Sequence, residues 1–255
     1  MATVKINYSD DMKRDDSVND ASSTKITIYE GDMFDYVLNA YRIGRSVTIH
    51  NFANNDQPGL YKKNRHGDHY FMTNTQEEQL LRSSFVIRKN KLRVWLHQDL
   101  YPICKDDDSH SCLYSKNILF YAERMKSWTN YSERPVVLPE TDWYHADVVT
   151  APALFRPRVK DNKYVDVNDR DRMLKRMILV INACKDSDVL VTGLWGCGAF
   201  SHPVREIMLM WKEAVQSSSQ KPKEIVFCYY LDMFTNSDDQ TVSKQTMFDI
   251  LLFQQ

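Results

Sequence analysis

Apolar residues recur along this chain with two different periods. Five runs predict buried β-strands, at residues 24–29, 45–52, 145–154, 189–192 and 223–232. Most of these runs are continuously apolar, which is typical of strands in a parallel sheet that is covered on both faces. The pattern therefore predicts a sheet that lies inside the protein.

Segments with helical periodicity lie between these strands. They span residues 31–44, 76–89 and 169–185, and a fourth helix is expected after the strand at 189–192. Gly44 is a stop signal, and Thr75 with Glu78 can form a capping box. The inward faces are expected to carry Phe34, Val37, Leu38 and Tyr41, then Leu80, Leu81 and Ser84, then Met173, Met177, Val180, Ile181 and Cys184.

The remaining stretches are more polar. Residues 1–23 are expected to be a loose polar lead-in, and residues 53–75 a long polar loop. Short apolar runs between residues 90 and 139 are interpreted as edge strands and connectors. Since strands and helices alternate, we expect one α/β domain over residues 24–255, with a mainly parallel sheet.

Composition narrows the class of protein. The chain has 255 residues, 43% of them hydrophobic, which is enough to bury a substantial core. A formal net charge of −1 argues against a duplex nucleic acid partner. No apolar run approaches the roughly 20 residues that cross a membrane, so no membrane partner is expected. Without the apolar segment of a signal peptide, the protein is expected to be intracellular, cytoplasmic or nuclear, and not secreted.

The five cysteines favour free thiols in a reduced compartment, because their number is odd and no CxxC pair occurs. Cys104, His110 and Cys112 lie close together, so a zinc site is conceivable. A tetrahedral site needs a fourth ligand, however, and the run of Asp between them is typical of a solvated loop. We therefore expect no metal and no cofactor.

Glycine is scarce in this chain and concentrated at one place. Of 7 glycines, three follow the strand at 189–192, as Gly193, Gly196 and Gly198. A glycine turn between a strand and a helix N-terminus presents free N–H groups, which suit a phosphate. The alternative is an ordinary turn between a strand and a helix.

Three segments are expected at the carboxyl ends of the sheet, where α/β proteins bind ligands. They are residues 51–59, 150–158 and 193–200, and Gln76-Glu77-Glu78 begins the adjacent predicted helix. Glu77 and Glu78 point about 100° apart on a helix, so one can bind sugar hydroxyls while the other reaches a reacting centre. Alternatively, both only stabilise the positive end of the helix dipole.

Taken together, five segments resemble the microbial-type poly(ADP-ribose) glycohydrolase domain, a branch of the macrodomain superfamily. In order, they are NFANNDQPG, TQEEQLLRSS, SCLYSKNILFYAE, ADVVTAPA and DVLVTGLWGCGAF, and the resemblance covers about Ser46 to Asp232. It implies a three-layer α/β/α fold with a mixed, mainly parallel central sheet. It also implies that the ligand is ADP-ribose or poly(ADP-ribose), either free or carried on ADP-ribosylated proteins.

The resemblance also implies roles for individual residues. Glu78 matches the catalytic acid of a glycosidase, Glu77 contacts ribose hydroxyls, and Asn54 faces the distal ribose. Gln76 begins the same motif, and Gly59 is what remains of a family glycine triplet. The loop expected to wrap the diphosphate contributes Gly193, Trp195, Gly196, Cys197, Gly198, Ala199 and Phe200.

Adenine is expected to stack on an aromatic residue after the last strand, and Tyr230 is the candidate, with Tyr229 and Phe234 as alternatives. Core packing is the competing explanation for these aromatic side chains.

One departure from the family pattern bears on catalysis. Where the family has three glycines, this chain has Gly59-Leu60-Tyr61, and side chains there obstruct a diphosphate. Three functions remain open at this point. The chain hydrolyses poly(ADP-ribose) or a related linkage, binds ADP-ribose or a related nucleotide without turnover, or is an unrelated α/β domain.

Overall fold

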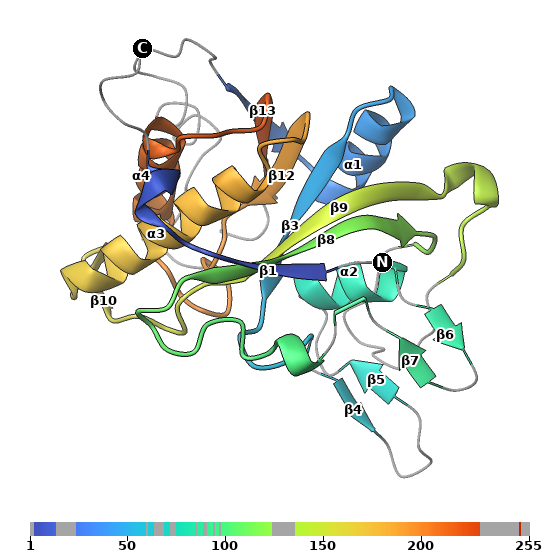
Figure 1. Ribbon diagram of the computed structural model, residues 1–255, viewed down its shortest axis with the longest axis horizontal. Helices are drawn as coiled ribbons and strands as arrows, with labels where there is room; N and C mark the ends of the chain where they lie inside the picture. The colour runs from blue at the N-terminus through green and yellow to red at the C-terminus, as the bar shows by residue number, and fades with distance from the viewer. Residues whose placement is uncertain are drawn as a thin grey trace.

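A seven-stranded sheet forms the middle of the molecule (Figure 1). The computed structural model describes residues 3–13, 24–59, 61–63, 69–71, 75–84, 86–88, 91–93, 95–96, 98–123, 136–229 and 250. The strands lie in the order β1 (Thr3–Asn7), β8 (Ser111–Phe120), β9 (Tyr144–Pro152), β3 (Val47–Ala53), β12 (Val189–Gly193), β13 (Glu224–Tyr229) and β2 (Lys25–Glu30).

The direction of the strands agrees with the predicted mixed sheet. The neighbours from β9 through β3, β12 and β13 to β2 pair in parallel. The strand β8 is antiparallel to β9, and β1 is antiparallel to β8. Every residue of β12 and β13 is buried, as expected for strands with helices on both faces.

Two helices cover each face of the sheet, which confirms the three-layer α/β/α architecture. The helices α3 (Val167–Ala183) and α4 (Val204–Ser217) pack on one face around Trp211, and share one core. The helices α1 (Met33–Arg42) and α2 (Gln76–Ser84) pack on the other face, where Leu80 belongs to the second core.

The connections carry short elements. Three two-stranded hairpins are formed by β4 (Tyr61–Lys63) with β5 (His69–Phe71), β6 (Val86–Arg88) with β7 (Lys91–Arg93), and β10 (Val159–Lys160) with β11 (Lys163–Tyr164). Single 3-10 turns span Asp10–Met12, Gln98–Leu100 and Glu140–Asp142.

The sequence prediction was wrong about the extent of α2. It placed a helix over residues 76–89, but α2 ends at Ser84 and residues 86–88 form β6. The hydroxyls of Ser83 and Ser84 donate to the carbonyls of Gln79 and Leu80, four residues earlier, and the β-branched Val86 and Ile87 follow. Such residues favour an extended backbone over a helix.

Two further predictions were wrong about the position of strands. Residues 1–23 were expected to be a loose lead-in, but Thr3–Asn7 form the edge strand β1. The run at 117–123 was interpreted as an edge strand or connector, but residues 117–120 belong to β8, which lies between β1 and β9. The register pairs Thr3 with Ser115, so the partner of β1 is too distant to be recognised from local pattern.

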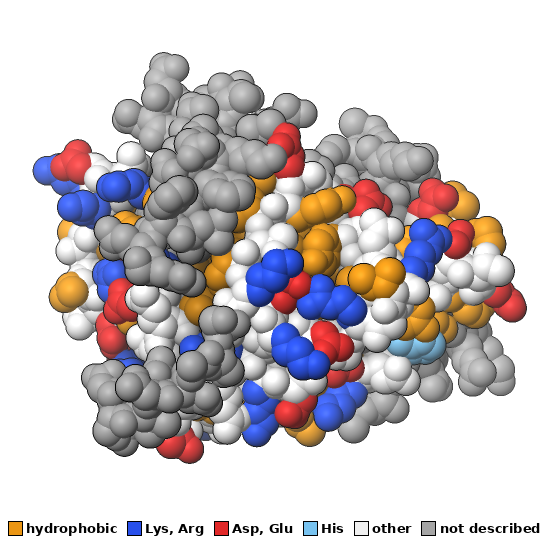
Figure 2. All heavy atoms as spheres, turned by 90° about the horizontal axis from the view of Figure 1, so that it is seen from above, with side chains coloured by type: hydrophobic (Ala, Val, Ile, Leu, Met, Phe, Trp, Pro, Cys, Tyr) orange, Lys and Arg blue, Asp and Glu red, His pale blue; other side chains and the backbone are white. Residues whose placement is uncertain are grey.

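Charged side chains of both signs share the surface. On the face drawn in Figure 2, Lys and Arg side chains lie among Asp and Glu side chains. Within the ranges given above, no helix combines the length and apolar character needed to cross a bilayer.

The core beneath α2 should determine stability. Leu80 is 0% exposed, so Leu80→Ala is expected to lower the free energy of unfolding by about 2–5 kcal/mol. Ile43 is 76% exposed, so Ile43→Ala serves as the control and should change it by no more than about 0.5 kcal/mol. Urea denaturation measures both, and equal effects would contradict this assignment of the core.

Candidate functional site at the carboxyl ends of the parallel strands

The carboxyl ends of β9, β3 and β12 lie at the same edge of the sheet. Residues 54–59 follow β3, residues 153–158 follow β9, and residues 194–203 follow β12. The first turn of α2 also reaches this edge. The structure therefore brings together the segments that the sequence placed there.

Gln76 attaches α2 to the backbone of β3. Its Oε1 atom accepts a hydrogen bond from the N–H of Phe52 at 2.8 Å, and its Nε2 atom donates to the carbonyl of His50 at 2.8 Å. The side-chain amide of Gln76 thus makes the two hydrogen bonds to β3 that the backbone of a neighbouring strand would otherwise make. Its observed role is to position the two glutamates that follow.

Glu77 is the most strongly perturbed acid at this edge. Its side chain accepts hydrogen bonds from Asn51 Nδ2 at 3.2 Å and from the N–H of Asn54 at 3.0 Å. The N–H of Gly59, whose φ is +63°, also donates to it. Burial raises the pKa of Glu77 to about 8, although these hydrogen bonds oppose the shift.

Glu78 closes the N-terminus of α2. Its Oε2 atom accepts a hydrogen bond from the N–H of Thr75 at 3.0 Å, and it also contacts the Thr75 hydroxyl. Glu78 is 2% exposed. The hydrogen bond from the Thr75 N–H to Glu78 is one of the two bonds of the predicted capping box. Glu78 also follows the buried Glu77 directly in the sequence.

The structure gives a different reason for glycine at each of the three positions at and after the end of β12. A Cβ atom on Gly193 would lie 2.8 Å from the carbonyl oxygen of Cys228. Gly196 has a φ of +82°, and a Cβ there would lie 2.7 Å from the His202 ring. At Gly198, a Cβ would meet nothing within 4 Å. Packing thus explains the first two glycines, whereas Gly198 borders open space.

The loop, rather than a helix N-terminus, supplies the free N–H groups. The sequence suggested that a helix begins directly after the glycine turn, but α4 begins only at Val204. Within the described part of the chain, the N–H groups of Gly196, Gly198, Ala199 and Phe200 donate to no backbone carbonyl. These groups lie on the loop at 194–203 and are available to an anion.

The side chains of this loop differ in exposure. Trp195 is 1% exposed, and its ring packs edge-on against His50, with 4.5 Å between ring centroids. Burial raises the pKa of the Cys197 thiol, which therefore stays protonated. Gly198 and Ala199 are exposed, and Phe200 is half-buried. The most exposed residues of the loop are therefore Gly198, Ala199 and Ser201.

Asn54 is also held by local contacts. Its side-chain Oδ1 accepts a hydrogen bond from the N–H of Asp56 at 2.8 Å, and its own N–H binds Glu77. The structure therefore places Asn54, Gly59, Gln76, Glu77 and Glu78 in one contiguous group around the end of β3.

Sequence reasoning missed two residues that organise this edge. Asn51 joins Glu77 to β9, because its Nδ2 atom also lies 3.3 Å from Thr150 Oγ1. His202 joins the segment after β9 to β11, with Nε2 at 2.8 Å from the Leu154 carbonyl and Nδ1 at 2.6 Å from the Tyr164 hydroxyl. A polar residue inside an apolar strand was a usable signal for Asn51.

The contacts of His202 show which of its two ring nitrogens carries the proton. The Leu154 carbonyl can only accept, so Nε2 carries the proton and Nδ1 accepts from Tyr164. Burial lowers the pKa of His202 to about 4, which keeps the ring neutral near pH 7.

Several predicted residues lie outside the described ranges. These are Tyr230 and Phe234, proposed for adenine, and Leu60, proposed to obstruct the diphosphate; for Tyr61, only the backbone in β4 is described. Tyr229 is buried, and its hydroxyl donates to Glu30 at 3.3 Å. Over the described ranges, no group of three or more His, Cys, Asp or Glu side chains could hold a metal ion.

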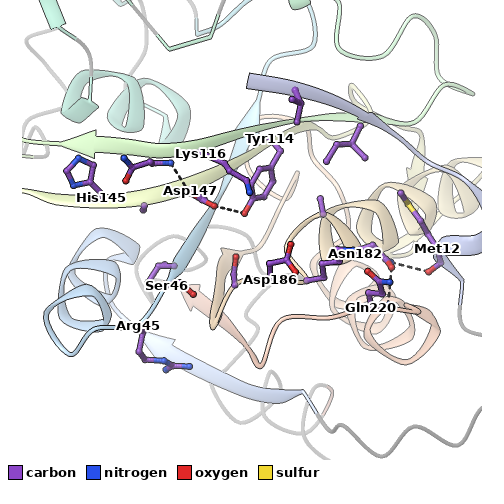
Figure 3. Close-up of a pocket in the computed structure, with 18 of the residues that line it drawn as sticks. Met12, Arg45, Ser46, Tyr114, Lys116, His145, Asp147, Asn182, Asp186 and Gln220 are labelled. Atoms are coloured by element: carbon purple, nitrogen blue, oxygen red, sulfur yellow. Dashed lines mark hydrogen bonds between the residues drawn. The ribbon is translucent and has the colours of Figure 1, made fainter. Parts of the chain in front are cut away.

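A cavity of about 660 Å³ lies at the opposite edge, near the amino ends of the parallel strands (Figure 3). Two of its polar side chains are hydrogen-bonded within the protein: the Tyr114 hydroxyl donates to Asp147 at 2.8 Å, and Asn182 Nδ2 donates to the backbone carbonyl of Met12 at 3.1 Å. Because the convergent acids and free N–H groups lie at the carboxyl edge, we place the candidate site there.

The raised pKa of Glu77 predicts a specific pH dependence of stability. The folded state favours the protonated carboxyl, so this contribution is complete below pH 4.5 and is lost as the pH rises through about 8. At about 1.4 kcal/mol per pKa unit, the loss should amount to a few kcal/mol.

The measurement is urea denaturation of the wild type and Glu77→Gln at several pH values across this window. The variant lacks the titrating group and should show a flatter dependence. Parallel curves for the two proteins would show that Glu77 does not titrate there.

Structures of poly(ADP-ribose) glycohydrolase share this fold. One, from Deinococcus radiodurans in complex with ADP-ribose, matches with a TM-score of 0.57 and 17% identity, over 90% of this chain and 85% of that one. Another, from Thermomonospora curvata and bound to the inhibitor ADP-HPD, matches with a TM-score of 0.57 and 20% identity, over 86% of this chain and 77% of that one.

No protein-family model matches the chain, and no curated protein matches it in a sequence search. The structural match nevertheless covers most of both chains, so the fold implied by the sequence resemblance is confirmed: this chain has the fold of the microbial poly(ADP-ribose) glycohydrolases.

Proposed function

We propose that this chain binds ADP-ribose at the carboxyl edge of its sheet and hydrolyses poly(ADP-ribose) or a related ADP-ribosyl O-glycosidic linkage. One observation carries the proposal. In a fold shared with glycohydrolases crystallised with ADP-ribose, the Gln76-Glu77-Glu78 motif contacts the end of β3, next to the strand β12 that the glycine loop follows.

The loop at 194–203 is the proposed diphosphate site. The N–H groups of Gly198, Ala199 and Phe200 have no backbone acceptor among the residues that the structure describes, and the space beside Gly198 is open. Backbone N–H groups at the end of a parallel strand bind phosphate oxygens well. On this assignment, the ribose lies toward Asn54 and Glu77, at the end of β3.

Glu78 is the proposed general acid. Glycosidic cleavage passes through an oxocarbenium-like transition state, in which the departing 2′-oxygen of the next unit must gain a proton. Glu78 would donate that proton and then accept one from the attacking water. Thr75, which contacts the same carboxyl group, would orient it.

Glu77 is proposed to bind ribose hydroxyls rather than to react. With a pKa of about 8, the Glu77 carboxyl group is protonated in most molecules at pH 7. A neutral neighbour reduces the repulsion that two adjacent carboxylates would exert on each other and on a diphosphate. The Glu77 side chain therefore adds little negative charge beside an anionic substrate.

Binding without hydrolysis is the second candidate. The observation that favours it is that both carboxyl groups are already held by the protein, Glu77 by Asn54 and Glu78 by Thr75. Leu60 and Tyr61, which replace family glycines, favour it as well. Turnover of poly(ADP-ribose) by the purified protein distinguishes the two candidates.

The glycine loop gives a matched test of binding. Gly198→Val should weaken ADP-ribose binding by more than about tenfold, or 1.4 kcal/mol, because its side chain enters the space proposed for the diphosphate. Its melting temperature should not change. Gly196→Val, by contrast, should lower the melting temperature, because of the His202 ring and the left-handed φ. Unaltered affinity of the Gly198 variant in calorimetry would refute the loop assignment.

Glu78→Gln tests the proposed acid. Glutamine also serves in a capping box, so the fold and ADP-ribose affinity should be retained. Hydrolysis of poly(ADP-ribose) should fall by on the order of 10²–10⁴-fold, because the proton donor is lost. Equal turnover by variant and wild type would remove Glu78 from the mechanism, and tight binding without wild-type turnover would establish the second candidate.

A further inference from the structure

An exposed basic hairpin leaves the sheet beside the candidate site. It comprises residues 155–164, with the sequence FRPRVKDNKY, and contains β10 and β11 (Figure 1). Four Lys and Arg residues and one Asp give this hairpin a formal charge of +3, in a chain whose net charge is −1. Its turn residues, Asp161 and Asn162, have φ values of +49° and +56°.

Both ends of this hairpin are attached to the loop at 194–203. At its start, Arg156 Nε donates to the Ala199 carbonyl at 3.3 Å, and the Phe155 and Phe200 rings pack edge-on with 5.2 Å between centroids. At its end, the Tyr164 hydroxyl binds His202 at 2.6 Å. The base of the hairpin is therefore packed directly against the proposed diphosphate loop.

Among the residues that the structure describes, the basic side chains of this hairpin have no acidic partner. Arg158, Lys160 and Lys163 are exposed, and none of them takes part in an ion pair with the rest of the described chain. Three cations of the neighbouring helix α3 differ in this respect, because Arg170, Arg172 and Lys175 each pair with a carboxylate. Unpaired charge at this place remains available to an external anion.

The same hairpin also exposes an aromatic ring next to its positive charges. Phe155 is 71% exposed, and the guanidinium carbon of Arg156 lies 5.4 Å from its ring centroid. Arg156 has a φ of +49°, a costly conformation for a residue with a side chain. Exposed aromatic rings next to cations bind single-stranded nucleotides, through stacking of bases and neutralisation of phosphates.

We propose that the 155–164 hairpin binds the ADP-ribose units of a poly(ADP-ribose) chain that lie beyond the unit held in the candidate site. The inference rests on the proposed function. Each unit of this polymer carries two phosphates and an adenine, which match the unpaired cations and the exposed Phe155. Free ADP-ribose fills only the inner site, so the hairpin selects polymer over monomer.

The test compares binding of polymer and monomer. The triple variant Arg158→Ser, Lys160→Ser, Lys163→Ser is measured against labelled poly(ADP-ribose) of fixed length and against ADP-ribose, in the Glu78→Gln background to limit turnover. Polymer affinity should fall by about tenfold or more, and the slope of log affinity against log salt should become shallower by about 2. ADP-ribose affinity should not change.

Two control variants sharpen the result. Lys116→Ser, Lys185→Ser and Lys223→Ser together remove the same charge at the amino ends of the strands, and should leave polymer affinity unchanged. Phe155→Ser should lower polymer affinity by about fivefold or more without affecting ADP-ribose, since stacking contributes to each bound base.

Three outcomes would overturn the inference: an unchanged polymer affinity, an equal loss for polymer and monomer, or an equal affinity and loss for an adenylate RNA with as many phosphates. The last outcome would identify a general polyanion surface. Failure of the wild type to bind ADP-ribose at all would instead refute the proposed function on which this inference rests.

Discussion

The buried carboxyl group of Glu77 joins three parts of the chain that would otherwise be independent. It lies on the first turn of α2 and accepts hydrogen bonds from Asn51 within β3, from Asn54 at the end of that strand and from Gly59 beyond it. A buried acid without such donors would be costly, so the strand end and the helix must stay together. Gln76 strengthens the same junction from the preceding position. The location of Glu78, and with it the proposed chemistry, depends on this arrangement.

A second junction defines the other half of the site. His202 is buried and neutral, and it connects the segment after β9, the loop after β12 and the β11 strand through Leu154, Gly196 and Tyr164. Gly196 allows the loop to pack against the His202 ring, whereas Gly198 leaves space outside the loop. Two nearby glycines in a glycine-poor chain thus serve different purposes. Gly196 allows close packing within the protein, and Gly198 leaves room for a ligand outside the loop.

The two edges of the sheet differ in the state of their polar groups. At the amino edge, the cavity is lined by side chains such as Tyr114 and Asp147 that satisfy one another. At the carboxyl edge, the N–H groups of Gly198, Ala199 and Phe200 have no backbone acceptor among the described residues. Arg158, Lys160 and Lys163 of the 155–164 hairpin have no acidic partner there either. Unsatisfied groups of one sign, gathered at one edge, favour an anionic ligand there, and for this reason the proposed site lies at the carboxyl edge and not at the cavity of the amino edge.

The amino-acid sequence by itself determined the elements whose residues carry a strong local period. The buried strands β3, β9, β12 and β13 and the inward face of α3 were predicted because burial on a regular element repeats at a spacing visible within a dozen residues. It also identified the Gln76-Glu77-Glu78 motif and the glycine loop. Only the tertiary structure decided that β1 pairs with β8, that α2 ends at Ser84 and that Asn51 and His202 organise the site. Each of those features depends on a partner far away along the chain or on competition between local contacts, and neither leaves a periodic signal in the sequence.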